Sequence, residues 1–178
     1  MSTIRDLKTE YDGLFTTGKF DSVSLFSGEM IVEVFTKDGA TVADAERCIG
    51  HYNHLNENKE VCDSIQIKLE KFFLYMYNEW KAMGIYDDIA ESLKPVMDGY
   101  KAGDKLIKYL YKPRLYVEPQ LEGETGYGIE CECPWEPEHQ CMILIRNNKV
   151  VYAGPSDGLS PWEDEDAYYC IWNDDENK

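Results

Sequence analysis

One short segment of the chain gathers residues that bind soft metal ions. Cys131 and Cys133 are two residues apart, His139 follows in the next loop, and Cys141 begins the next apolar run. Zinc prefers four thiolate or imidazole ligands in a tetrahedron, and side chains two apart in a strand point to the same face. The four residues are therefore a candidate metal site at one end of a hairpin. The alternative is a set of small buried thiols in a core, because the spacing is not that of a zinc ribbon and free cysteines are commonly buried.

The adjacent pair Glu138 and His139 has the chemistry of a general acid and base. Histidine titrates near neutral pH, and a neighbouring carboxylate favours its charged form. No serine or threonine nucleophile accompanies the pair in this loop. The alternative is a structural loop in which His139 donates to a backbone carbonyl and Trp135 closes one edge of the core. We expect no catalytic residues here, and we interpret the chain as a protein that is not an enzyme.

The charge of the chain restricts its partners. Its 178 residues include 34 acidic and 18 basic ones, for a formal net charge of −16. This charge disfavours nucleic acid and anionic membrane surfaces as partners, and it favours a basic protein. Residues 101–116 form a basic and aromatic island that could hold a nucleic-acid strand, but pairing with the acidic C-terminus explains it equally well. No segment reaches the roughly 18 apolar residues of a membrane helix, and the N-terminus lacks the apolar core of a signal peptide. We therefore expect a cytoplasmic protein with free thiols.

Residues 155–178 combine acidic and aromatic side chains. Aromatic residues supply contact area at low entropic cost, and carboxylates steer a basic partner toward its site. The alternative is a solubilising tail whose aromatic side chains fold onto the rest of the protein. The expected partner-binding residues are Trp162, Glu163, Asp164, Glu165, Asp166, Tyr168, Tyr169 and Trp172.

The apolar pattern predicts an α+β fold. Strand-forming residues on both sides of a Ser27-Gly28 turn indicate an N-terminal strand pair within residues 20–36. Apolar residues at helical spacing predict central amphipathic helices over about residues 42–54 and 59–83. The next segments are predicted to be a helix over 87–97 that Pro95 kinks or ends, a short helix over 105–110 capped by Asp104, and strands over 115–117, 128–133, 141–146 and 149–153.

These elements fit one compact arrangement. Asn147-Asn148 joins the last two strands as a C-terminal β-hairpin, and the order of elements favours helices packed on a mostly antiparallel sheet. We expect residues 1–154 to form a single α+β domain. The acidic aromatic tail of residues 155–178 is expected to pack on that domain or to flank it.

The loop before this hairpin carries a resemblance to a known family. Trp135-Glu136-Pro137-Glu138-His139 precedes an apolar strand, and the hairpin ends at Gly154. The segment resembles the C-terminal signature of a family of uncharacterised bacterial domains, in which a Trp-Asp-x-Glu-His-Gly loop enters a hairpin ending in a Val-Gly step. Here Glu136 replaces the aspartate and Gln140 replaces the glycine. Trp135, Glu138 and His139 match the family motif, which assigns them no role.

The resemblance implies an N-terminal strand pair, two or three central helices, and a small immunity or partner protein of the kind found beside bacterial toxin systems. Together with the charge, it leads us to expect a non-catalytic bacterial protein, without a cofactor, that neutralises a basic toxin domain by charge-guided association. The alternative is a zinc-binding or hydrolytic protein built on Cys131, Cys133, His139 and Cys141.

Overall fold

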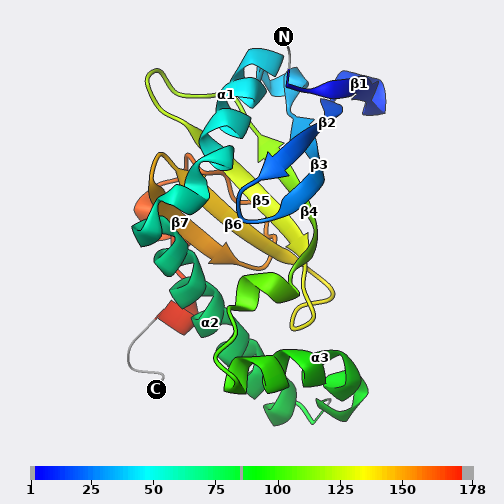
Figure 1. Ribbon diagram of the computed structural model, residues 1–178, viewed down its shortest axis with the longest axis vertical. Helices are drawn as coiled ribbons and strands as arrows, with labels where there is room; N and C mark the ends of the chain where they lie inside the picture. The colour runs from blue at the N-terminus through cyan, green and yellow to red at the C-terminus, as the bar shows by residue number, and fades with distance from the viewer. Residues whose placement is uncertain (1–2, 85, 174–178) are drawn as a thin grey trace.

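A seven-stranded sheet forms the frame of the molecule. The computed structural model describes residues 3–84 and 86–173 (Figure 1). The strands lie side by side in chain order, and every neighbouring pair is antiparallel except β3 and β4, which are parallel. This arrangement confirms the expected α+β class. The strands are β1 (Arg5–Glu10), β2 (Phe15–Val23), β3 (Ser27–Val34), β4 (Tyr111–Val117), β5 (Gly126–Glu132), β6 (Cys141–Arg146) and β7 (Lys149–Gly154).

Three helices connect β3 to β4, since a parallel pair needs a long crossover. They are α1 (Val42–Asn53), α2 (Lys59–Ala82) and α3 (Tyr86–Lys101). In the first turn of α1, the Thr41 hydroxyl accepts the Asp44 amide at 3.1 Å, and the Asp44 carboxylate accepts the Thr41 amide at 2.9 Å. These two reciprocal bonds form a capping box at the start of the helix. Helices α1 and α2 cover one face of the sheet, whereas α3 lies beyond its end (Figure 1).

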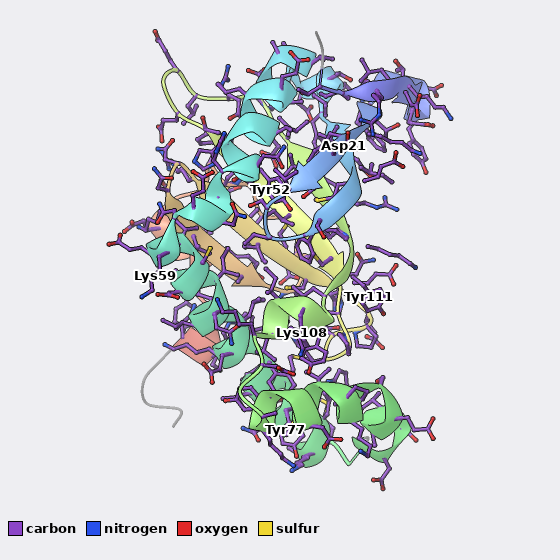
Figure 2. The ribbon with its side chains drawn as sticks, viewed as in Figure 1. Asp21, Tyr52, Lys59, Tyr77, Lys108 and Tyr111 are labelled. Carbon is purple, nitrogen blue, oxygen red and sulfur yellow. The ribbon has the colours of Figure 1, made fainter. Side chains whose placement is uncertain are left out.

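The main core lies between the sheet and these two helices. The apolar stripe predicted for α2 is buried there and includes Val61, Ile65, Leu69, Phe72 and Phe73. Tyr52 of α1 is fully buried between its helix and the sheet (Figure 2), with its hydroxyl 3.0 Å from the Ser22 hydroxyl. In the described part of the chain, no helix combines the length and the apolar character that a membrane crossing requires.

The C-terminal segment covers part of the opposite face of the sheet. Tyr168 and Cys170 pack there on Met142 and Leu144 of β6 and on Tyr152 of β7, in a second apolar cluster. The same face of β2, β3 and β4 is open and carries a shallow groove. The segment after Gly154 therefore belongs to the packed structure at least as far as residue 173.

Several local predictions were wrong. The sheet has an additional edge strand, β1, whose side chains are mostly exposed. The helix predicted over 87–97 is α3, which continues past Pro95 to Lys101, so the predicted end was wrong. Asp104 does not cap the next turn: its carboxylate accepts the Tyr109 hydroxyl and pairs with Lys108. This turn is a 3₁₀ helix over Leu106–Tyr109.

Candidate functional site

Trp135 fixes residues 135–139, which we call the motif loop, to α2. Its ring is fully buried and meets Phe72 and Phe73 edge-on, at centroid distances of 6.4 and 5.4 Å. The indole N–H of Trp80 donates to the backbone carbonyl of Trp135 at 2.9 Å. Trp135 thus has a structural position at the edge of the core.

Glu136 organises the rest of the loop. Its side chain is only 7% exposed. One carboxylate oxygen accepts the backbone N–H groups of Glu138 and His139, at 3.2 and 3.1 Å, and lies 3.2 Å from Nδ1 of His139. The histidine is 59% exposed and its carboxylate partner is Glu136, not the adjacent Glu138. A structural role for the loop predicted a hydrogen bond from His139 to a backbone carbonyl. The structure instead places His139 Nδ1 against the Glu136 carboxylate.

The three cysteines of the predicted metal cluster are buried, whereas its histidine is exposed. Cys131 and Cys141 lie opposite each other on β5 and β6, and the Cys133 thiol is 3.7 Å from the Glu136 carbonyl. Burial raises the pKa of the Cys131 thiol, while a hydrogen bond with Cys133 and then burial raise the pKa of the Cys141 thiol. Both thiols are therefore neutral at physiological pH. All six cysteines are free, as expected.

The four predicted ligands are thus not brought together as a set. The His139 side chain is exposed, and its Nδ1 lies against the Glu136 carboxylate. Within residues 3–84 and 86–173, no group of three or more His, Cys, Asp and Glu side chains has a metal-binding arrangement.

The predicted partner-binding residues of the tail divide into two groups. Three aromatic side chains pack onto the protein itself. Trp162 lies over Gly126 and under the Arg146 guanidinium, Tyr168 is buried, and Trp172 stacks with Phe72 at 5.1 Å. The remaining predicted residues are exposed, and they are Glu163, Asp164, Glu165, Asp166 and Tyr169. We call Glu163–Asp166 the acidic loop.

The ion pairs of the basic island do not involve the acidic loop. Lys108 pairs with Asp104 inside the island itself, and Lys112 and Arg114 pair with Glu132 of β5 and Glu33 of β3. Within the acidic loop, Glu165 pairs with Lys149 at 2.8 Å. Among the residues described, no basic side chain pairs with the other three acidic side chains of the loop.

A cavity of about 220 Å³ opens next to the acidic loop. Strands β4, β5 and β6 form its floor, and residues 156–161 form one wall. Two half-buried carboxylates line it. Glu130 accepts the Tyr116 hydroxyl at 2.9 Å and the Ser156 hydroxyl at 2.6 Å, and Glu118 accepts the Ser160 hydroxyl at 2.5 Å.

The acidic loop acts electrostatically on one carboxylate of this cavity, Glu118. The pKa of Glu118 is raised mainly by burial, and further by repulsion from Glu163 and Asp38. Carboxylates from three separate segments therefore act on each other here. Sequence reasoning missed this arrangement because Glu118 and Glu130 lie in separate segments and neither belongs to a recognised motif. The one available signal was the position of Glu130 two residues after Gly128, on the same face of β5.

A row of four aromatic rings leads from the first strands to the cavity. Tyr11 and Phe15 have centroids 5.2 Å apart, Phe15 and Phe35 6.3 Å, and Phe35 and Tyr116 6.1 Å. Tyr11 is 77% exposed, whereas Phe35 and Tyr116 line the cavity. The aromatic row leads to the cavity and the acidic loop lies next to it, so these three features form one candidate binding region.

Comparison with known proteins identifies a family but no characterised relative. No curated protein and no solved structure matches the chain. A family model described as Domain of unknown function (DUF6985) matches residues 4–160. The match includes the motif loop and nearly all of the cavity lining, and it ends before the acidic loop. The chain therefore belongs to this uncharacterised domain family.

Proposed function

We propose that this protein is a non-catalytic bacterial binding protein of immunity type, which neutralises a basic toxin domain by charge-guided association. The observation that carries the proposal is the acidic loop. Glu163, Asp164 and Asp166 are exposed and have no basic partner among the described residues. They belong to a chain with a net charge of −16.

An exposed acidic surface of this kind acts mainly on association. Clustered charge of one sign raises the rate of encounter with an oppositely charged partner, and salt weakens this effect. Affinity then needs apolar anchors at the centre of the contact. In this proposal the exposed ring of Tyr11, at the end of the aromatic row, supplies such an anchor.

A toxin domain is the partner whose chemistry fits best. A nuclease toxin needs a basic surface to hold its nucleic acid, so an acidic protein can block it by occupying that surface. The immunity role also draws on the resemblance of residues 135–154 to the bacterial family motif. In this proposal the protein acts in the bacterial cytoplasm, needs no cofactor, and binds neither nucleic acid nor membrane.

The test uses the full chain and two matched charge reversals. Asp164→Lys with Asp166→Lys alters the acidic loop, and Asp88→Lys with Glu91→Lys makes the same charge change on exposed positions of α3. Basic proteins captured from the host and from competing strains are purified, and their association rates are measured at low and moderate salt. The growth of cells expressing each captured protein is then compared with and without this chain.

We expect a one-to-one complex whose association is about ten-fold slower with the loop variant and changes about two-fold or less with the α3 variant. Co-expression should also restore growth. Equal rates for the two variants, or growth inhibition that co-expression does not relieve, would overturn the proposal.

A further inference from the structure

The cavity beside the acidic loop is negatively charged and lined partly by apolar groups. Its lining comprises Phe35, Tyr116, Glu118, Gly128, Glu130, Met142, Leu144, Ser156, Gly158, Leu159 and Pro161. Aromatic rings, a thioether and aliphatic groups surround the two carboxylates. This lining contains no lysine, arginine or histidine.

Within residues 3–84 and 86–173, no basic side chain forms an ion pair with either carboxylate of the cavity. Arg114 is paired with Glu130 in the register of β4 and β5, but its guanidinium bonds Glu33 at 2.8 Å. Glu130 accepts two hydroxyl groups and Glu118 accepts one, and each carboxylate has lone pairs to spare. A charge held partly out of water without a counter-charge is unfavourable, so the cavity favours a cationic ligand.

We propose that this cavity binds a guanidinium group. Its volume of about 220 Å³ corresponds to about seven water molecules at about 30 Å³ each. An arginine side chain beyond Cα has about the same number of heavy atoms. A guanidinium is planar, stacks on aromatic rings and offers several donors in one plane to carboxylates.

The lining matches each part of such a ligand. The plane of the guanidinium stacks on Tyr116, while its N–H groups donate to Glu130 and Glu118. The alkyl stem contacts Met142 and Leu144. An ammonium group is more strongly hydrated and does not stack in this way, so it fits the aromatic wall less well.

The guanidinium group has two possible sources. It can belong to an arginine of a bound polypeptide or to a free small molecule. The inference does not rest on the toxin partner, because the acidic loop does not line the cavity. Failure of one proposal therefore leaves the other intact.

The probe for this site is n-propylguanidinium, which reproduces the arginine side chain. Binding is followed by NMR on the full chain with ¹³C-methyl methionine, reading the signal of Met142. We expect a saturable shift with an affinity on the order of 1 mM, typical of a fragment of this size. Binding of n-butylammonium should be about ten-fold weaker, and the neutral isostere n-propylurea should cause no shift.

Variants of the chain test which groups hold the ligand. Glu130→Gln should weaken binding about ten-fold, whereas Glu122→Gln, at an exposed turn position outside the cavity, should leave it unchanged. Because Glu130 also holds Tyr116 and Ser156, Glu118→Gln serves as a second variant if Glu130→Gln lowers the melting temperature. A blocked Gly-Arg-Gly peptide distinguishes the sources: binding at least equal to that of the free probe indicates a polypeptide, and exclusion indicates a small molecule.

Three results would overturn the proposal. They are the absence of a saturable shift with n-propylguanidinium at about 20 mM, equal shifts with n-propylurea, and unchanged binding when both Glu118→Gln and Glu130→Gln are present in a folded protein.

Discussion

Replacing Glu136 with alanine should destabilise the protein through the motif loop. The substitution removes the oxygen that accepts the Glu138 and His139 amides at 3.2 and 3.1 Å. A hydrogen bond to a charged acceptor contributes roughly 1.5–3 kcal/mol. Both residues are exposed, so water replaces part of each bond and the lower end applies. For the two bonds together we expect the free energy of unfolding to fall by about 3 kcal/mol, which corresponds to about 6–12 °C in melting temperature for a chain of this length.

Urea unfolding at neutral pH measures this change, and two further variants assign it. Glu136→Gln retains an acceptor oxygen and should cost only about 1 kcal/mol, because the charge is lost and the bonds remain. Glu138→Ala removes an exposed side chain and should change stability by less than about 0.5 kcal/mol. If Glu136→Ala and Glu138→Ala have equal effects, the buried carboxylate does not organise the loop and the reasoning is refuted.

Three other predictions test the packing and the titrating groups. Gly154→Ala should cost about 1–3 kcal/mol in thermal unfolding, because a Cβ there would lie 2.6 Å from Trp172, whereas Gly50→Ala, with open space in α1, should stabilise by about 0.5–1 kcal/mol. The pKa of Glu118 is raised in the folded protein, so its ionised form lowers the stability above the folded pKa but not below the unfolded value of 4.5. The unfolding free energy of Glu118→Gln should therefore rise relative to that of the unmodified protein between about pH 4 and pH 7. A difference between the two proteins that stays constant with pH would contradict the raised pKa. Iodoacetamide should label the half-buried Cys62 in the native protein, while the buried, neutral cysteines of β5 and β6 react only after unfolding; peptide mass spectrometry reads both.

The sequence predicted those elements in which periodicity and capping agree. Helix α2 has a continuous apolar stripe, and its observed bounds differ by a residue from the expected ones. The edge strand β1 was missed because its residues are charged and exposed, so it shows no alternation of apolar side chains. Its pairing with β2 is made by the backbone, which leaves little trace in side-chain type. Pro95 lies within α3, where the expectation from the missing amide was a kink or an end.

The candidate site was predicted only in part, for a similar reason. The sequence located the motif loop, but it predicted the adjacent Glu138 and not Glu136 as the partner of His139. Adjacency in sequence does not determine which carboxylate turns inward, and here the buried one lies three residues before the histidine. The cavity depends on Glu118, Glu130 and residues 156–161, which are far apart in the chain. No local pattern contains that information.

The C-terminal segment links the packing of the protein to its proposed binding surface. Its aromatic residues were expected either to contact a partner or to fold back, and Tyr168 and Trp172 fold back. Tyr168 also donates its hydroxyl to the Ser160 carbonyl at 2.9 Å, which ties the end of the acidic loop to the segment that forms one wall of the cavity. A loop fixed in this way loses less conformational entropy on binding than a free tail with the same charges. Under the proposed function, the packed aromatic residues would therefore support recognition indirectly, by ordering the carboxylates that a basic partner would meet.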